Sequence, residues 1–282
     1  MNQEINTEKH TGQIVLIKYG GNAMTDETIK ENLLQEVSYL KQSGFRPVIV
    51  HGGGPVIKET LDAAGIESEF IGGHRKTDET SMRFVEMALR GAVNGELVSI
   101  LNRERVGAVG ISGKDGNLVI AEKRYHEATV DGKTQKVDLG QVGDVQSVNP
   151  HIVRVLLDNG YLPVISPVSL GKDGTDYNIN ADMFAGHLAG ALKVYSYMVL
   201  TNVDGLMEDI DKPDSLIRKV TLEDLKTKYS SVIHSGMIPK IDSCQIALSS
   251  GAVQACIING TRRGALTEAL THDEFNGTKI LA

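Results

Sequence analysis

Short runs of consecutive apolar residues recur along the chain, and longer stretches with helical periodicity separate them. Continuous apolar runs are typical of parallel strands buried on both faces, because a strand with one wet face alternates apolar and polar residues. This alternation of runs predicts an α/β sandwich around a mainly parallel sheet. The expected strands are residues 14–18, 47–51, 107–112, 118–122, 162–167, 197–202 and 253–259. The expected helices are residues 26–43, 55–64, 78–103, 149–159, 181–192, 221–229 and 239–250.

Two polar stretches interrupt this alternation of expected strands and helices. Residues 126–144 are polar and contain glycine, which predicts a hairpin or a loop that leaves the sheet. Residues 173–182 lie between two series of strands and helices, and their polarity makes them the expected place for a domain junction.

Two of the apolar runs end in glycines. The first ends in Lys18 followed by Gly20 and Gly21, and the second ends in three glycines that include Gly53 and Gly54. Glycines let an anion approach backbone N–H groups closely, and the N-termini of the helices expected next attract anions. A lysine at the carboxyl end of a parallel strand lies where ligands bind in open α/β sheets. The pattern favours a phosphate site. The alternative is that the glycines only form tight turns and that the lysine is an ordinary surface residue.

Other polar residues stand at expected strand ends or helix starts. Arg75 follows a glycine pair and can bind a carboxylate in bidentate fashion, or it can simply be exposed. Asn178, Asn180 and Asp182 alternate, so an extended segment would place them on one face, and helix capping explains one or two of them. Lys240 stands near a helix start, where a cation is unfavourable, which invites a functional explanation.

The composition narrows the classes of partner. The 282 residues carry a formal net charge of −7, and no dense cluster of Lys and Arg suggests a nucleic-acid partner. Cys244 and Cys256 show no metal-site spacing and no disulfide framework. The first 13 residues lack the apolar segment of a signal peptide, and no apolar run approaches the ~20 residues that span a bilayer. We expect a cytoplasmic protein with no membrane or nucleic-acid partner and no metal bound by its own side chains.

Neither a P-loop nor a G-x-G-x-x-G turn is present, so the commonest nucleotide signatures are missing. The motifs instead resemble those of the amino-acid kinase family, and the similarity runs from about residue 14 to the C-terminus. The Gly-His-Arg and Asn-Ile-Asn-Ala-Asp elements point to its acetylglutamate branch. The motifs that carry the resemblance are Lys18-Tyr-Gly-Gly21, His51-Gly-Gly-Gly-Pro55, Gly73-His-Arg75-Lys-Thr-Asp78, Tyr177-Asn-Ile-Asn-Ala-Asp182, Asn202-Val-Asp-Gly205 and Gly236-Met-Ile-Pro-Lys240.

The resemblance implies a three-layer αβα sandwich around a mainly parallel central sheet. Residues 1–190 would form an N-terminal lobe that binds the acyl substrate and dimerises, and residues 191–282 a C-terminal lobe that binds ATP. Lys18 and Lys240 would stabilise the transferring phosphoryl group, and Asp182 would hold both lysines. Gly20, Gly21, Gly53 and Gly54 would offer N–H groups to the phosphoryl group and the substrate. Arg75 and Asn178 would bind the α-carboxylate, with Asn180 also on the substrate side. The implied nucleotide-binding residues are Asn202, Val203, Asp204, Gly205, Leu206, Met207, Val232, Ile233 and His234.

The resemblance also implies a reaction: ATP, bound with Mg²⁺, phosphorylates the γ-carboxylate of N-acetyl-L-glutamate to N-acetyl-L-glutamyl 5-phosphate, in arginine biosynthesis. A carboxylate already carries the nucleophilic charge, so no general base is needed. The catalytic problem is to bring two anions together and neutralise them. Lysines, Mg²⁺ and glycine-turn N–H groups are suited to that, whereas a hydrolase needs an activated water or nucleophile.

The sequence departs from the family pattern at two places. Asn202 stands where many relatives have an acidic residue, which leaves its role open. Residues 1–13 have too few apolar side chains for the N-terminal helix that links dimers into hexamers in arginine-inhibited members, so we expect a homodimer with weak or absent arginine feedback. Two alternatives stand beside the main hypothesis: a kinase for another carboxylate, such as N-acetyl-aminoadipate or a carrier-linked amino acid, and a catalytically silent nucleotide-binding regulator.

Overall fold

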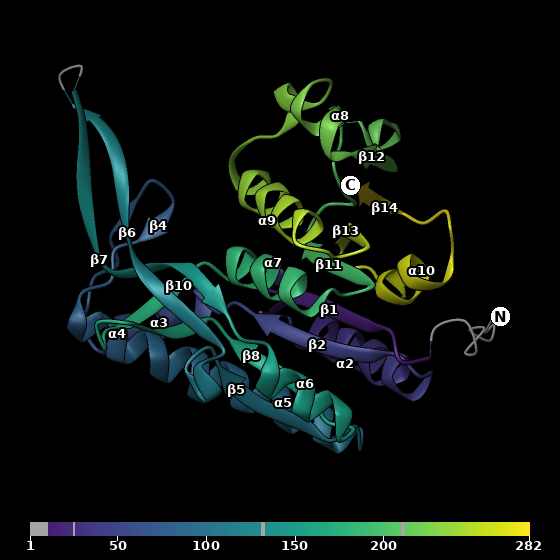
Figure 1. Cartoon of the computed structure of the whole chain (residues 1–282), viewed down its shortest axis with the longest axis horizontal. Coiled ribbons are helices and arrows are strands. Elements are labelled where there is room, and N and C mark those ends of the chain that lie inside the picture. Colours follow the sequence, from purple (N-terminus) through teal and green to yellow (C-terminus); the bar gives the residue numbers. More distant parts are fainter. Residues whose placement is uncertain (1–10, 25, 131–132, 210–211) are drawn as a thin grey trace.

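Strands and helices alternate along the computed structural model, which describes residues 11–24, 26–130, 133–209 and 212–282 (Figure 1). In chain order the elements are β1 (Ile14–Tyr19), α2 (Glu27–Gln42), β2 (Arg46–His51), α3 (Gly54–Ala63), β3 (Phe70–Ile71), β4 (His74–Arg75), α4 (Glu79–Glu86), α5 (Asn94–Arg103), β5 (Ala108–Ser112), β6 (Val119–Val130), β7 (Lys133–Val148), α6 (His151–Asp158), β8 (Leu162–Ser166), β9 (Val168–Gly171), β10 (Asp176–Ile179), α7 (Ala181–Leu192), β11 (Ser196–Thr201), β12 (Lys219–Thr221), α8 (Leu222–Lys226), α9 (Ile238–Ser249), β13 (Gln254–Asn259), α10 (Ala265–Thr271) and β14 (Gly277–Leu281). Residues 1–10, on which the expectation about an N-terminal helix mainly rests, lie outside the described residues.

The described residues form a central sheet of eight strands in the order β12-β14-β13-β11-β1-β2-β8-β5. The pairs from β13 to β5 are all parallel. Strand β14 runs antiparallel to β13 and parallel to β12, so these two strands run opposite to the other six. Helices cover both faces of the sheet (Figure 1). The predicted three-layer α/β architecture with a mainly parallel sheet is confirmed.

Each central strand contributes to two hydrophobic cores, because successive side chains of a strand point to opposite faces. Leu16 and Val199 belong to the core beneath α6, α7 and α9. Ile17 and Met198, their neighbours in sequence, belong to the core beneath α2, α5 and α10. All four side chains have 0% exposure, and burying each such side chain stabilises the fold by roughly 1.5–3 kcal/mol. The continuous apolar runs therefore arise from burial on both faces of the sheet.

A smaller closed barrel of β10, β7, β6 and β9 stands beside the sheet. Its strands β6 and β7 form a long antiparallel hairpin that projects away from the helices, which confirms the hairpin expected over 126–144 (Figure 1). The segment from β4 to α4 is fixed to this hairpin, because the N–H of Thr77 donates to the carbonyl of Leu139 at 2.9 Å. Strands β9 and β10 of the barrel were not predicted from the sequence, because they are four residues long and partly polar.

Several predicted boundaries are wrong. The single helix expected over 78–103 is α4 and α5 joined by a π-helical segment, Met87–Val93, whose wider turn leaves no periodic signal in the sequence. The strand expected over 118–122 continues to Val130 in β6, and the helix expected over 221–229 ends at Lys226. Helix α10 and strands β12 and β14 were also missed.

Within the described residues, no helix is both long enough and apolar enough to cross a bilayer.

Candidate active site

Asp182 lies between two lysines that are distant in sequence. Lys18 Nζ is 3.1 Å from Asp182 Oδ1, and Lys240 Nζ is 3.5 Å from Oδ2. Lys18 stands near the carboxyl end of β1, Asp182 in the first turn of α7 and Lys240 in the first turn of α9. Lys18 and Asp182 are each only 6% exposed. Two ammonium groups and one carboxylate leave one positive charge in a buried place, which suits an anionic ligand.

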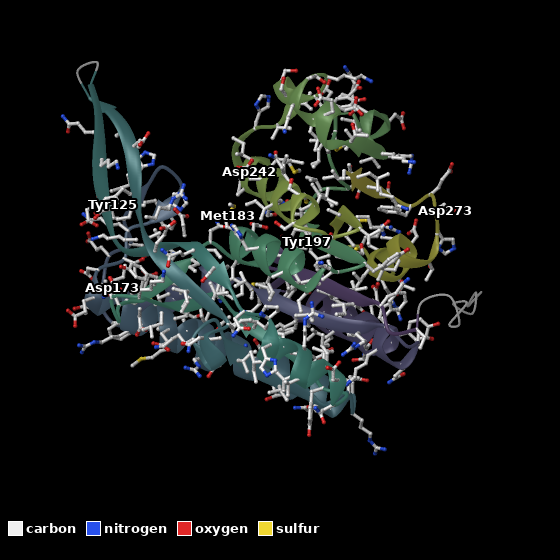
Figure 2. All side chains as sticks on the ribbon, in the orientation of Figure 1. Tyr125, Asp173, Met183, Tyr197, Asp242 and Asp273 are labelled. Atoms are coloured by element: carbon white, nitrogen blue, oxygen red, sulfur yellow. The ribbon has the colours of Figure 1, made fainter. Side chains whose placement is uncertain are left out.

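The close packing of α7 on α9 brings Asp182 and Lys240 together. A Cβ atom added at Gly186, one turn after Asp182, would lie 2.5 Å from the backbone oxygen of Ser243, so glycine is needed for this approach. The fully buried Tyr197 of β11 connects the two helices (Figure 2). Its hydroxyl is 3.3 Å from the carbonyl oxygen of Asp182 and 3.1 Å from Ser243 Oγ, which donates to the carbonyl of Lys240 at 2.7 Å.

The charges of the cluster shift its pKa values. Burial acts to raise the pKa of Asp182, but the positive charges of Lys18 and Lys240 outweigh it, so the pKa lies below its usual range. Burial lowers the pKa of Lys240, the charge of Lys18 lowers it further, and Asp182 only partly offsets both. Asp182 is therefore ionised at neutral pH, and Lys240 loses its proton more easily than an exposed lysine.

The two predicted glycine turns lie side by side against this cluster. A Cβ at Gly20 would lie 3.2 Å from Lys18 Nζ and 3.7 Å from the backbone nitrogen of Gly52. The Gly52 N–H donates to the carbonyl of Tyr19 at 2.8 Å, which fixes one turn to the other. The glycine at position 20 therefore leaves space for the ammonium group of Lys18.

The last two glycines of the second turn differ in their surroundings. A Cβ at Gly53 would lie 2.6 Å from Leu89 Cδ2 in the π-helical segment, so packing accounts for this glycine. A Cβ at Gly54 would meet nothing within 4 Å. Neither packing nor a positive φ angle accounts for glycine at position 54, which agrees with a backbone that a ligand must approach.

A cavity of about 190 Å³ opens at the two lysines. It connects the lysines and the first glycine turn to the end of β11, and so brings Asn202 to the cluster. Its lining consists of Lys18, Gly20, Gly21, Leu200, Thr201, Asn202 and Lys240.

A second cavity, of about 260 Å³, gathers five of the residues expected to bind nucleotide. Ile233 does not line it and packs against the core instead. Asp204 lies in the turn before the cavity, where its Oδ1 accepts from Asn259 Nδ2 at 2.9 Å. This hydrogen bond holds the pKa of Asp204 below its usual range. The lining is Gly205, Leu206, Met207, Glu208, Ser231, Val232, His234 and Met237, of which Glu208, Ser231 and Met237 were missed from the sequence.

Arg75 lies beside the second glycine turn. Its guanidinium donates to Ser68 Oγ and contacts the carbonyl oxygen of Gly54 at 3.4 Å. It also stacks over the ring of Phe70, 4.6 Å from the centroid. The guanidinium is thus fixed at the start of α3, next to the backbone that Gly54 leaves open.

The expected shared face of Asn178, Asn180 and Asp182 is wrong, because the strand ends before the segment does. Asn178 lies in β10, which stops at Ile179. Asn180 instead caps α7: its Oδ1 accepts from the N–H groups of Asp182 at 2.9 Å and Met183 at 3.2 Å. The cap turns the chain into a helix, and so Asp182 projects from its first turn toward the lysines.

A third cavity, of about 600 Å³, lies between the β3–β4 turn and the starts of α7 and α9. Arg124 of β6 lines it and is paired with Asp144 at 2.6 Å. Met183 and Asp242, both labelled in Figure 2, line it from α7 and α9. Sequence reasoning missed these three residues, because nothing in their local patterns distinguishes them from ordinary surface positions. The full lining is Gly72, Gly73, His74, Arg124, Asn180, Met183, Gly236, Ile238, Pro239 and Asp242.

Among the described side chains, no three of His, Cys, Asp or Glu are grouped as a metal site.

The fold is shared with several solved proteins. It superimposes on N-acetylglutamate synthase from Neisseria gonorrhoeae, complexed with coenzyme A and N-acetyl-glutamate, with a TM-score of 0.80 and 22% identity. The match covers 98% of this chain and 61% of that one, so the chain spans about three fifths of the synthase. Carbamate kinase from Giardia lamblia bound to AMP-PNP gives a TM-score of 0.68 at 18% identity, over 96% of this chain and 98% of that one. These likenesses place the chain in the α/β class with the amino-acid kinase fold.

The chain belongs to the amino acid kinase family, whose sequence model matches residues 13–259. It is 44% identical to the acetylglutamate kinase of Methanocaldococcus jannaschii, over 97% of this chain and 92% of that protein. It is also 44% identical to the acetylglutamate kinase of Geobacter metallireducens, over 96% of this chain and 93% of that protein.

Proposed function

We propose that the protein transfers the γ-phosphoryl group of ATP to the γ-carboxylate of N-acetyl-L-glutamate, in arginine biosynthesis. The observation that carries the proposal is the Lys18–Asp182–Lys240 cluster, buried beside two glycine turns at the carboxyl ends of parallel strands. Acetylglutamate kinases that are 44% identical over nearly their whole length support the choice of substrate.

In this proposal, the two lysines neutralise the charge of the transferring phosphoryl group. The group becomes more anionic at its equatorial oxygens in the transition state, so preorganised cations stabilise that state more than the bound substrates. Asp182 holds both ammonium groups within 3.5 Å and does not act as a base. N–H groups of Gly20, Gly21, Gly53 and Gly54 add hydrogen-bond donors.

The acyl substrate brings its own nucleophile, an ionised carboxylate, and so the site needs no proton acceptor. Arg75 and Asn178 bind the α-carboxylate of the substrate, with Asn180 on the same side. The guanidinium of Arg75 is already held beside Gly54, which supports this placement. Fixing both reactants in one orientation lowers the entropic part of the barrier.

ATP binds as its Mg²⁺ complex, the usual form in phosphoryl transfer. Its adenine nucleoside occupies the 260 Å³ cavity, and its phosphates extend past Asn202 into the 190 Å³ cavity at the lysines. Residues 1–190 serve the acyl substrate and residues 191–282 the nucleotide. We expect the protein to act in the cytoplasm as a homodimer.

The test uses purified protein with ATP, Mg²⁺ and a panel of carboxylic acids. Hydroxylamine traps an acyl phosphate as a hydroxamate, which a colorimetric assay measures. We expect hydroxamate with N-acetyl-L-glutamate above the other acids. A preference for N-acetyl-aminoadipate or a carrier-linked amino acid would overturn the substrate, and no hydroxamate from any acid would favour a nucleotide-binding regulator.

A further inference from the structure

His51 and Asn94 form a buried chain of hydrogen bonds that ends at the second glycine turn. His51 is 0% exposed and Asn94 is 4% exposed. Asn94 is the first residue of α5, directly after the π-helical segment. The proposed function gives neither side chain a role.

The partners of the two side chains determine where the imidazole proton lies. Asn94 Nδ2 is 2.9 Å from the carbonyl oxygen of Val164, which can only accept, so the amide nitrogen must face that carbonyl. The same nitrogen is 3.0 Å from His51 Nε2, which must therefore accept the second amide hydrogen. The proton of the neutral ring then resides on Nδ1, which donates to the carbonyl of Gly52 at 2.8 Å.

This hydrogen bond fixes the orientation of one peptide group. The Gly52–Gly53 peptide is planar and trans, so its N–H points opposite to the carbonyl that His51 holds. The N–H of Gly53 stands directly before α3, where helix-end donors have no partner within the helix. Gly52 itself lies against Gly20 and Ala181, the neighbour of Asp182. Gly52, which carries the carbonyl that His51 holds, therefore lies next to the lysine–aspartate site.

We propose that His51, with its tautomer set by Asn94, is a positioning residue that directs the Gly53 N–H toward the transferring phosphoryl group. The inference rests on the proposed function, which places the phosphoryl group there. Glycine has the widest backbone freedom of any residue, and an unsupported triplet of glycines would leave this peptide free to rotate. A donor aligned in advance stabilises the transition state without reorganisation.

Nuclear magnetic resonance tests the tautomer without any assay of activity. Long-range ¹H–¹⁵N spectra of the intact protein should show His51 neutral, with its proton on Nδ1, from pH 5 to pH 8. Burial lowers the pKa of His51 to about 4, so the signal should not titrate in that range. A proton on Nε2, or a charged ring at pH 6, would overturn the inference whatever the substrate is.

Kinetics test the consequence with two variants. His51→Leu has a similar volume but no donor, and its kcat should fall about 10–100-fold while KM for ATP stays within about twofold. His51→Asn carries an amide that branches from Cγ as Nδ1 does, and it should recover most of the lost kcat. A merely structural role would lower the melting temperature of both variants without this recovery.

The matched control is Leu97→Ala, one turn after Asn94 in α5 and also 0% exposed. It should lower the melting temperature and leave kcat unchanged. If the unaltered protein phosphorylates N-acetyl-L-glutamate and His51→Leu keeps its kcat, the inference is wrong and the proposed function stands. If the unaltered protein phosphorylates no acid, the proposed function is wrong, and the inference that His51 positions the Gly53 N–H for the phosphoryl group is wrong with it. If His51→Leu does not fold, His51→Asn and the tautomer measurement decide.

Discussion

The charge state of Lys240 is the residue-scale property that most directly controls the proposed reaction. Its pKa lies below the usual value because burial and the neighbouring Lys18 both disfavour the ammonium form. As the pH rises through that lowered pKa, the ammonium loses its proton and one of the two positive charges disappears. We therefore expect kcat/KM, which reports the free enzyme, to fall on the alkaline side at a lower pH than an ordinary lysine, with a pKa near 10.4, would give.

Substitution separates the charge of Lys240 from its geometry. Lys240→Ala should lower kcat at least about 100-fold with the fold intact, because one preorganised cation is lost. Lys240→Arg should be less active than the unaltered protein but lose the alkaline limb, because a guanidinium stays charged. The measurement is a pH profile of kcat/KM, with the exposed Lys58→Arg as the matched control. An unchanged alkaline limb in Lys240→Arg would mean that another group titrates there.

At this scale the sequence identifies some residues and not others. Local pattern alone predicts that Lys18, Gly20 and Gly54 bind phosphate, because a lysine and glycines at a strand end offer a positive charge and accessible N–H groups to an anion. The relation of Asp182 to Lys240 depends on two helices whose contact no local pattern encodes. Arg124 and Asp242 were missed for the same reason: each lines a cavity only through the packing of distant elements.

Among the elements, the spacing of α7 and α9 determines whether the site is assembled. Gly186→Ala would place a Cβ 2.5 Å from a backbone oxygen of α9, so the helices must move apart. The 3.5 Å contact between Asp182 and Lys240 should lengthen with them. We expect kcat to fall about 10–100-fold, because small displacements of catalytic groups cost large factors. Steady-state kinetics and the melting temperature check this.

Gly190→Ala is the matched control, because it alters the same helix one turn farther from Asp182. The added Cβ would contact the side chain of Ser250, which directly follows α9. It should lower the melting temperature and reduce kcat much less than Gly186→Ala. Equal losses of kcat in the two variants would show that the spacing at the first turns does not control the reaction.

Helix α10 shows why some elements escape prediction. Its N-cap residue is Gly264, which has no side chain to cap the helix. Glu36 of α2 caps it from a distance: its carboxylate accepts from the N–H groups of Gly264, Leu266 and Thr267. The usual start signal of a helix is a polar residue in the preceding position. Here that signal stands more than two hundred residues earlier in the chain. The start of α4, in contrast, lies where the sequence predicts a helix start, because Asp78 caps it locally.

Over the whole molecule, the two proposed lobes share one sheet and one helix pair. β1 of residues 1–190 pairs with β11 of residues 191–282, and α7, which contains the boundary itself, packs on α9. We expect a single cooperative transition in urea, because neither lobe can unfold without exposing the core of the other. Far-UV circular dichroism and tyrosine fluorescence should give coincident curves, since the chain has no Trp. Two separated transitions would contradict this expectation.

The position of β1 in the sheet has a consequence for the order of synthesis. β1 leaves the ribosome before both of its partners in the sheet: β2 follows soon after, but β11 ends only at Thr201. One edge of β1 stays unpaired while roughly 180 further residues are added, which at ~5–20 residues per second takes about 10–40 s. An unpaired apolar strand edge is a template for wrong pairing. The nascent chain therefore passes through a period in which chaperone binding or delayed collapse must protect the strand that later carries Lys18.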